Sequence, residues 1–153
     1  MVAVEGLEAG DADLAFCAVR PPGHHATPDR SMGFCLLNNV AVTATALTRA
    51  GHRVAIVDVD AHHGNGTQDV FYEDDQVLFV SCHQWPLYPG SGSIDETGTG
   101  VGAGTTINVP LPPGAAGDDY RQVMATVVVP AMERFDPDWS VSYTHLRDHE
   151  TLR

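Results

Sequence analysis

The most informative segment of this chain is Val54-Ala55-Ile56-Val57-Asp58-Val59-Asp60-Ala61-His62-His63-Gly64-Asn65-Gly66. Its first four residues are apolar and mostly β-branched, which predicts a buried strand. Side chains alternate along an extended segment, so Asp58, Asp60 and His62 project to one side. They follow the carboxyl end of the strand, where open α/β sheets place their ligands. Carboxylates and imidazole suit a divalent metal such as zinc. The alternative is a polar loop in which Asp and Asn cap a turn.

A second histidine cluster, Arg20-Pro21-Pro22-Gly23-His24-His25-Ala26, follows the strand-like run of residues 14–19. The prolines fix φ and remove backbone donors, and the glycine permits an unusual turn. Such a stiff loop can hold two imidazoles in a defined place. Adjacent histidines on a loop can also be merely solvated, but two clusters at strand ends can face one crevice.

Together these segments resemble the zinc-dependent histone deacetylase family, with its bacterial members and the acetylpolyamine amidohydrolases. The matching segments are Arg20-Pro-Pro-Gly-His-His-Ala26, Gly33-Phe-Cys-Leu-Leu-Asn-Asn39, Asp58-Val-Asp-Ala-His-His-Gly-Asn-Gly66 and Tyr88-Pro-Gly90. The resemblance runs from Asp13 to about Trp139 and covers only the middle portion of a family catalytic domain. It implies an α/β, three-layer arginase/deacetylase-like fold with a mainly parallel sheet, incomplete at both ends.

The pattern of apolar residues and turn signals predicts alternating strands and helices, which is typical of a parallel sheet. Strands are expected at residues 14–19, 53–57, 77–82 and 105–109. Helices are expected at residues 2–9, 37–50, 67–72 and 118–135, the last kinked or shortened by Pro130. Residues 83–104 form a long glycine-rich loop, and loops of this length are usually functional or mobile. Its glycines do not predict a phosphate site, because no helix opens behind them.

Composition narrows the class of protein. The 153 residues are enough for one modest domain. Eight basic against 20 acidic residues give a net charge of −12. This charge argues against nucleic acid or an anionic membrane as partner, and is compatible with cationic peptides or polyamines. No apolar stretch is long enough to span a bilayer. Cys17, Cys35 and Cys82 are expected to be buried free thiols, and with no secretion signal they favour the cytoplasm. The oligomeric state stays open.

The two ends of the chain are expected to differ in origin. Residues 1–139 are interpreted as a partial deacetylase catalytic domain. In the family, the segment that ends at Trp139 continues into a buried strand and a Gly-Phe-Asp segment, which this chain lacks. Residues 140–153 are therefore interpreted as a non-native, artefactual tail. The alternative is a His/Asp metal site within residues 144–149, which lacks a structural scaffold.

The resemblance implies a role for each polar residue of the two clusters. Asp60 and His62 are expected to be two zinc ligands, with the third, an aspartate, in the absent segment. Catalytic zinc sites use three protein ligands. The acid–base pair and the groups that orient it are His24, His25, Asp58 and Asn65. Asp58 pairs with His24 and Asn65 with His25. Since Asn carries no charge, His25 should be the less basic histidine, which favours it as the proton acceptor that becomes the donor.

Two further sets of residues are implied. The expected walls of an acyl-lysine channel are Gly33, Phe34 and Tyr88, although aromatic residues also pack readily in ordinary loops. A structural monovalent-cation site, for potassium, is expected at Asp58, Asp60, His62, Ser81 and Cys82. His83 has no assigned role, and His52 and His63 are expected to be structural or surface residues.

The expected function is that of a zinc-dependent amidohydrolase, which removes acetyl or other acyl groups from lysine side chains or acetylated amines. Its substrates are expected to be an acetylated lysine peptide, an acetylpolyamine or a small acetylated amine. This chain alone is expected to be inactive, because it lacks the third ligand and the family's oxyanion tyrosine. The alternatives are a catalytically dead interaction module and an arginase-like metallohydrolase. Intact histidines and carboxylates disfavour the first, and the Arg-Pro-Pro-Gly-His-His segment disfavours the second.

Overall fold

A four-stranded parallel sheet forms the centre of the computed structural model, which describes residues 1–145. The strand order is β3-β2-β1-β4, and every neighbouring pair is parallel. The strands are β1 (Val54–Asp58), β2 (Val77–Gln84), β3 (Thr106–Leu111) and β4 (Trp139–Tyr143). The predicted parallel sheet is confirmed.

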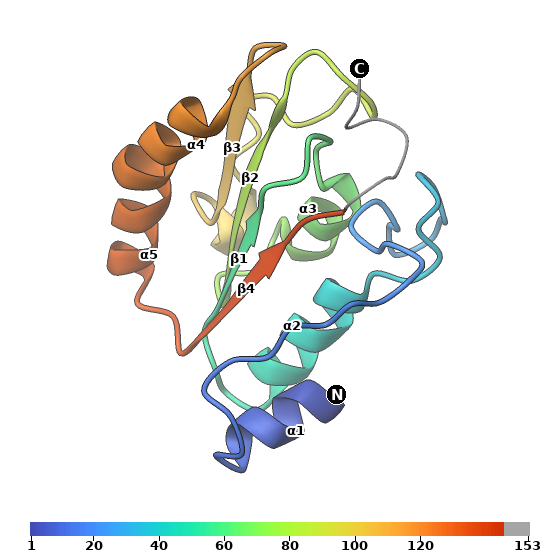
Figure 1. Cartoon of the computed structure of the whole chain (residues 1–153), viewed down its shortest axis with the longest axis vertical. Helices are drawn as coiled ribbons and strands as arrows, with labels where there is room; N and C mark the ends of the chain where they lie inside the picture. The colour runs from blue at the N-terminus through green and yellow to red at the C-terminus, as the bar shows by residue number, and fades with distance from the viewer. Residues whose placement is uncertain (146–153) are drawn as a thin grey trace.

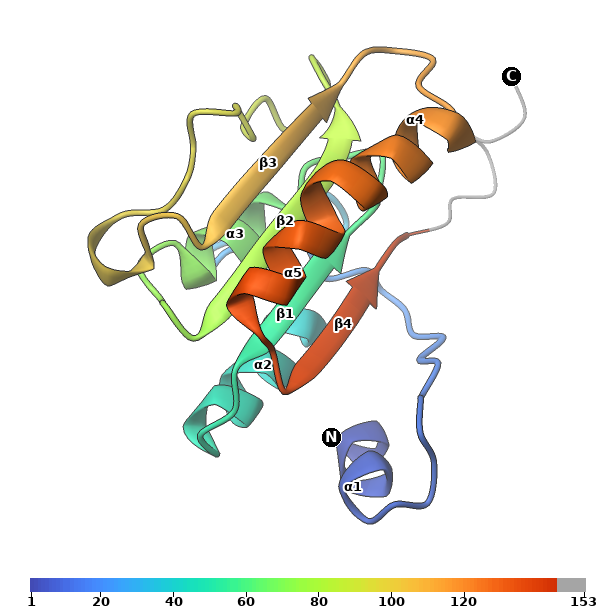
Figure 2. The ribbon, with the colours of Figure 1, turned by 90° about the vertical axis from the view of Figure 1, so that its left-hand side faces the viewer.

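Helices cover both faces of this sheet and make three layers (Figures 1 and 2). One face carries α2 (Asn39–Arg49) and α3 (Asn65–Phe71), with α1 (Val2–Glu8) beside α2. The other face carries α4 (Gly117–Val123) and α5 (Val129–Phe135). A π-helical turn over residues 124–128 joins α4 to α5, directly before Pro130. The predicted single helix is thus present, and this wider turn accommodates the proline, which cannot donate a backbone hydrogen bond.

Strand β1 is buried on both faces, as its unbroken apolar sequence predicts. Val54 and Ile56 pack into a core with α1, α2 and α3, whereas Ala55 and Val57 pack into a second core with α5 and the π-helical turn. Because successive side chains point to opposite faces, one short strand anchors both helical layers. The side chain of Asp58, the last residue of β1, therefore has a fixed position and a fixed direction.

The strand predicted at residues 14–19 is wrong. This segment is irregular and exposed, with Leu14 79% and Phe16 91% accessible to solvent. A strand is stable only when its backbone pairs with a neighbour, and none of the strands in residues 1–145 lies beside this segment. The predicted burial of Cys17, which lies in this segment, is therefore also wrong, whereas Cys35 and Cys82 are buried as predicted.

Strand β4 begins at Trp139 and pairs with β1 in register, so that Asp58 lies opposite Tyr143. The first residues of the predicted tail, 140–143, are thus part of this sheet, while residues 146–153 lie outside the described chain. The interpretation of the tail as non-native stays a prediction. The chain crosses from β3 to β4 over the sheet, so the order reverses between β1 and β4. Ligand sites in open parallel sheets lie at such a switch point.

Candidate functional site

The two histidine clusters meet at the carboxyl end of β1. The rings of His24 and His25 lie 4.0 Å apart between centroids, and the ring of His62 lies 5.9 Å from that of His25. His24 and His25 are both buried, with 1% and 4% of their surface exposed. The predicted convergence of both clusters on one crevice is therefore present in the structure.

The histidine loop is held against the start of α3 by its backbone. The N–H groups of Gly66 and Thr67 both donate to the carbonyl of His24, at 2.9 and 3.1 Å. A Cβ atom at Gly66 would collide with the carbonyl of Ala26. Glycine at this position thus permits the close approach that fixes His24 and His25 beside β1.

His24 is oriented by a carboxylate. Its Nδ1 lies 2.8 Å from Oδ2 of Asp58 and, because a carboxylate only accepts, Nδ1 carries the proton. The Nε2 lone pair is then left to face the crevice, 4.0 Å from Oδ1 of Asp60. Asp58 is fully buried, and burial raises its pKa although the neighbouring His24 acts in the opposite direction.

His25 is oriented by an amide. Its Nδ1 donates to Oδ1 of Asn65 at 2.8 Å, which again leaves Nε2 as the free lone pair. Burial, followed by the charge of His24, lowers the pKa of His25 to about 4. Gly33 lies on this ring, where a Cβ atom would collide with it. The two neighbouring imidazoles thus differ in partner, as the sequence indicates.

Asp60 and His62 lie together on the crevice side of His24. Oδ1 of Asp60 accepts from the backbone N–H of His62 at 2.9 Å and from its Nδ1 at 3.1 Å. Burial disfavours the Asp60 carboxylate, but the hydrogen bond from the His62 ring and the charge of His24 outweigh it, so the Asp60 pKa is lowered. This keeps Asp60 anionic, which is the state of a metal ligand.

These two residues do not complete a zinc site. Carboxylate and imidazole are suitable donors, but catalytic zinc sites have three protein ligands. Within residues 1–145, no group of three or more His, Cys, Asp or Glu side chains is arranged to hold a metal ion. Residues 1–145 therefore supply a pair of suitable donors and not a complete metal centre.

Aromatic and glycine residues border the crevice. The Tyr88 ring lies edge-on to His25 at 5.1 Å and to His62 at 6.2 Å. Phe34 is 76% exposed and has a φ of +63°, which is rare for a bulky residue. The structure thus brings two of the three predicted channel residues, Gly33 and Tyr88, into contact with the His25 ring. Phe34 adjoins Gly33 in the sequence and projects into solvent.

The residues predicted to hold a monovalent cation lie where the end of β1 pairs with β2, and in the turn that follows β1. Asp58 is opposite Ser81 in the register of the two strands, and Ser81 and Cys82 are both fully buried. Burial raises the pKa of Cys82 to about 12, so its thiol is uncharged. Asp60 and His62 follow directly from β1, so all five residues are neighbours.

Sequence reasoning missed two features of the site. Tyr143 lies 4.7 Å from the His24 ring, and its hydroxyl oxygen accepts a hydrogen bond from the N–H of Gly23 at 3.1 Å. Burial raises the Tyr143 pKa to about 12. The second feature is a buried network around His63 and His83. Tyr143 was assigned to a tail, and no motif signals the network.

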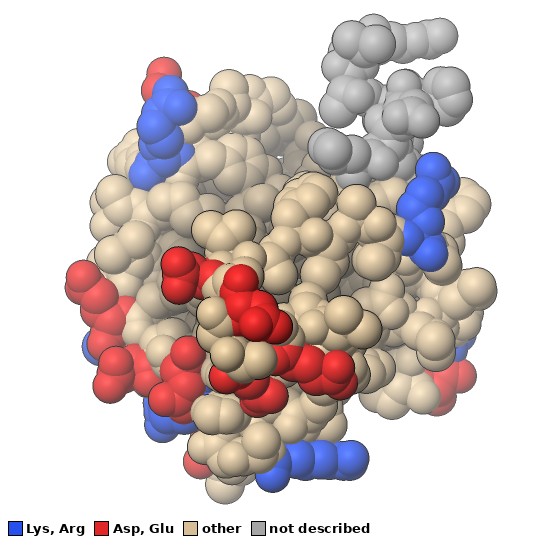
Figure 3. Space-filling view, turned by 60° about the horizontal axis from the view of Figure 1, so that its bottom comes forward, with Lys and Arg blue, Asp and Glu red and all other residues tan. Residues whose placement is uncertain are grey.

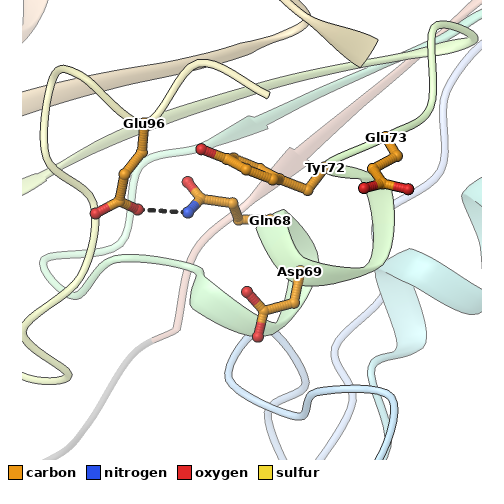
Figure 4. Close-up of a pocket in the computed structure, with 5 residues that line it drawn as sticks. All are labelled: Gln68, Asp69, Tyr72, Glu73 and Glu96. Atoms are coloured by element: carbon orange, nitrogen blue, oxygen red, sulfur yellow. Dashed lines mark hydrogen bonds between the residues drawn. The ribbon is translucent and has the colours of Figure 1, made fainter. Parts of the chain in front are cut away.

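The surface beyond the crevice is acidic. Figure 3 shows Asp and Glu side chains gathered on one face, with Arg at its margins. A cavity of about 460 Å³ opens beside α3 (Figure 4) and is lined by Gln68, Asp69, Tyr72, Glu73 and Glu96. Burial, together with the charges of Asp29 and Glu96, raises the pKa of Asp69.

No helix in the described part of the chain has the length and apolar character needed to cross a bilayer.

Comparison with known proteins agrees with this geometry. The histone deacetylase domain profile matches residues 1–143. A probable deacetylase of Archaeoglobus fulgidus is 50% identical over 130 residues, which cover 84% of this chain and 36% of that protein. A histone deacetylase-like amidohydrolase of Pseudomonas aeruginosa is 46% identical over 141 residues, which cover 90% and 37%. The crystal structure of acetylpolyamine aminohydrolase from Burkholderia pseudomallei superposes with a TM-score of 0.85 at 42% identity, covering 92% of this chain and 41% of that one.

The fold and the site thus define a deacetylase-type α/β domain. The chain belongs to the histone deacetylase family, and it spans about a third of the length of the curated relatives it matches.

Proposed function

We propose that this chain forms part of a zinc-dependent amidohydrolase that removes acetyl or other acyl groups from lysine side chains or acetylated amines. The observation that carries the proposal is the buried pair His24 and His25, each fixed by its own partner and both facing Asp60 and His62. Two imidazoles with free Nε2 atoms at one crevice can accept and return a proton.

The two imidazoles are proposed to have different roles, because His24 is bonded to Asp58 and His25 to Asn65. His25 is uncharged at neutral pH, since burial holds its pKa at about 4, and its Nε2 is free to accept a proton. In this proposal the Asp58 carboxylate accepts from Nδ1 of His24, orients its ring and places a negative charge beside it. In this assignment His25 is the proton acceptor that becomes the donor, with His24 as the electrostatic partner.

The proposed metal is Zn²⁺, held by Asp60, His62 and a third ligand from outside the described residues. When bound, zinc would polarise the amide carbonyl and acidify a water molecule. A structural K⁺ at Asp58, Asp60, His62, Ser81 and Cys82 is proposed as a second ion. Its support is the buried position of Asp58, Asp60, Ser81 and Cys82 where the end of β1 adjoins β2, with the partly exposed His62 beside them.

The proposed substrates are acetylated lysine peptides, acetylpolyamines or small acetylated amines. The relatives bear names that refer to deacetylase, amidohydrolase and acetylpolyamine aminohydrolase activity. A net charge of −12 favours cationic substrates and disfavours nucleic acid or anionic membrane as a partner. Gly33, Phe34 and Tyr88 are the proposed walls for the acyl chain. The proposed location is the cytoplasm.

A hybrid enzyme tests this function. Residues 1–139 replace the corresponding segment of the Pseudomonas aeruginosa amidohydrolase, and the hybrid is assayed on an acetyl-lysine peptide and on an acetylated diamine. The hybrid should deacetylate in the presence of zinc. His25→Ala in the hybrid should lower kcat by about 10²–10⁴-fold, the usual contribution of a general acid or base. The 153-residue chain alone should show no turnover.

His52→Gln is the matched control, because His52 is partly exposed and lies beside Asp138, away from the crevice. It should leave activity unchanged. A folded, zinc-loaded hybrid without activity would overturn the enzymatic reading and favour a catalytically inactive interaction module. Turnover by the 153-residue chain itself would show that two ligands suffice and would overturn the requirement for a third.

A further inference from the structure

A second buried polar cluster lies beside the crevice, at the ends of β1, β2 and β3. Its centre is a pair of imidazoles in contact, His63 and His83, whose ring centroids lie 4.8 Å apart with the ring planes inclined at 49°. Both are almost completely inaccessible, with 1% and 0% of their surface exposed. Neither takes part in the contacts of His24 and His25, and the proposed deacetylation assigns them no role.

The hydrogen bonds fix the protons on these rings. Nε2 of His83 donates to the carbonyl of Gly92 at 3.0 Å, so its Nδ1 accepts from the Ser81 hydroxyl. Nε2 of His63 donates to Oε1 of Gln68 at 3.0 Å, so its Nδ1 accepts from the hydroxyl of Ser91 at 2.9 Å. The oxygen acceptors at both Nε2 atoms thus place a proton there, and each Nδ1 faces a serine hydroxyl.

The same network fastens the long loop after β2. The Glu96 carboxylate accepts from the backbone N–H groups of Gly92 and Ser93 at 3.0–3.1 Å, and also from Nε2 of Gln68 (Figure 4). Asn108, on β3, donates to Gln68 and to the carbonyl of Glu96. The loop is thus bound to β2, to β3, to the turn after β1 and to α3 by partners that are mostly buried.

Gly92 lies directly on the two rings. A Cβ atom there would collide with both His63 and His83, and φ is +94°, which favours glycine. Because Gly92 has no side chain, the backbone of the loop packs directly against the imidazole pair. Ser91 and Gly92 follow Tyr88 by only three and four residues, so this anchor restrains the Tyr88 ring beside His25.

We propose that His63 and His83 are positioning residues. Buried in contact with each other and hydrogen-bonded on both ring nitrogens, they anchor residues 91–96 and thereby place Tyr88 against His25 and His62. The proposal rests on the proposed function in that it gives this loop the task of shaping the acyl-lysine channel. His63 follows His62 directly, so one turn of chain carries both a metal donor and the anchor for the opposite wall.

The test compares two serines of the same loop in the 153-residue protein. Ser91→Ala removes the hydroxyl that bonds to His63, whereas Ser93→Ala removes a hydroxyl that, within residues 1–145, only accepts a 3.4 Å bond from the N–H of Asp95. Nuclear Overhauser contacts between the Tyr88 and His25 rings report the position of the wall. Nitrogen-15 shifts of the His63 and His83 rings report the tautomers, and denaturant unfolding reports stability.

In the unmodified protein, both rings should give the pattern of a proton on Nε2. Ser91→Ala should abolish or strongly weaken the Tyr88–His25 contact and move the Nδ1 shift of His63. Ser93→Ala should leave both unchanged, and Ser91→Thr should restore the contact because it retains the hydroxyl. A wild-type Tyr88–His25 contact in Ser91→Ala, or equal loss in Ser93→Ala, would overturn the proposal.

A glycine pair gives a second test if Ser91→Ala unfolds the chain. Gly92→Ala and Gly90→Ala both place a side chain at a φ above +90°, but only Gly92 faces the rings. Gly92→Ala should therefore lose the Tyr88–His25 contact and Gly90→Ala should keep it. The reverse result, or the same result in both, would contradict the anchor.

The hybrid enzyme separates this proposal from the function on which it rests. If the hybrid is active, Ser91→Ala should raise KM with little change in kcat, since a displaced wall weakens binding and leaves the histidines in place. An inactive hybrid in which Ser91→Ala still breaks the Tyr88–His25 contact would overturn the function and leave the anchor standing. An active hybrid in which Ser91→Ala changes neither KM nor the Tyr88–His25 contact would overturn the anchor and leave the function standing.

Discussion

His24 and Asp58 are 34 residues apart in the sequence and are joined in the interior by a hydrogen bond of 2.8 Å between Nδ1 and Oδ2. The second oxygen of Asp58 accepts the backbone N–H of Asp60 at 3.0 Å. One buried carboxylate thus orients an imidazole of the first cluster and the chain turn that carries the second. This makes Asp58 the link between both halves of the candidate site.

Asp58→Asn tests that link. The amide can keep the bond to His24, but its NH₂ group then faces the N–H of Asp60, where two donors meet without an acceptor. We expect the free energy of unfolding to fall by about 1–3 kcal/mol, the usual penalty for an unsatisfied buried donor. Denaturant titration of the 153-residue protein measures it. In an active hybrid, kcat should fall by about 10²-fold or more, since the charge beside His24 is lost.

Asp69→Asn is the control for Asp58→Asn. Asp69 is a largely exposed residue, and partial burial of its carboxyl group, together with the charges of Asp29 and Glu96, raises its pKa. Removing its charge should change stability by no more than about 0.5 kcal/mol. Equal destabilisation by both substitutions would mean that the buried bonds of Asp58 contribute nothing specific.

Much of this arrangement could be predicted from the sequence. The unbroken apolar run of β1 required burial on both faces, and this fixed a parallel sheet with polar residues at its carboxyl end. Local sequence patterns failed to predict structure where an element is stable only if it pairs with a segment distant in the sequence. Residues 14–19 have a strand-like sequence but no strand beside them, so they remain irregular and exposed.

The buried network was beyond sequence reasoning for a similar reason. His63, Gln68, His83 and Glu96 belong to different elements, and none of them forms a motif with another. Their association follows from the strand register and from Gly92, which can lie flat on the rings because it has no side chain. Such a cluster becomes visible only when the strand ends are placed side by side.

Gly33→Ala tests the packing on His25. The backbone of Gly33 has a φ of +57°, and a Cβ atom would collide with the His25 ring. Gly51→Ala is the matched control, because Gly51 also has a positive φ but no atom within 4 Å of the added Cβ. Both should lose about 1 kcal/mol from backbone strain. Gly33→Ala should lose at least about 1 kcal/mol more by overpacking and should shift the His25 ring resonances. Equal losses would place His25 away from Gly33.

The stability of the metal-free protein should fall on mild acidification. The pKa of His63 is lowered to about 4, chiefly by burial and then by the charge of His83, and lies below the ordinary value of 6.5. Between these values the unfolded chain binds more protons. The contribution of His63 to the free energy of unfolding should therefore be complete above pH 6.5. It should decline as the pH falls toward 4, by up to about 1.4 kcal/mol per pH unit for one such histidine.

Urea titrations between pH 7 and pH 4.5, with a chelator present, measure this slope. His25 contributes in the same direction, since its pKa is also lowered to about 4. Asp58 contributes in the opposite direction, because its pKa is raised by burial. His63→Gln should flatten the profile whatever its effect at pH 7. An unchanged slope would show that His63 is protonated as readily in the folded chain as in the unfolded one.

Zinc should bind the 153-residue protein weakly, because Asp60 and His62 are two donors where catalytic sites have three. Calorimetric titration should give an affinity low enough that a chelator leaves the melting temperature unchanged. His62→Gln should abolish the remaining binding, while His52→Gln should not. Tight stoichiometric binding that survives His62→Gln would place the metal elsewhere in the chain.

Phe16→Ser should raise the soluble yield without lowering stability. Phe16 is 91% exposed and lies in the irregular segment between Leu14 and Val19, which are also exposed. Exposed apolar side chains grouped in this way promote association. The free energy of unfolding should change by no more than about 0.5 kcal/mol, whereas Phe79→Ser, at a fully buried position, should lose at least about 3 kcal/mol. Light scattering and denaturant titration of the two variants give both quantities. A loss above about 1 kcal/mol in Phe16→Ser would show that this side chain is buried in solution by contact with another surface.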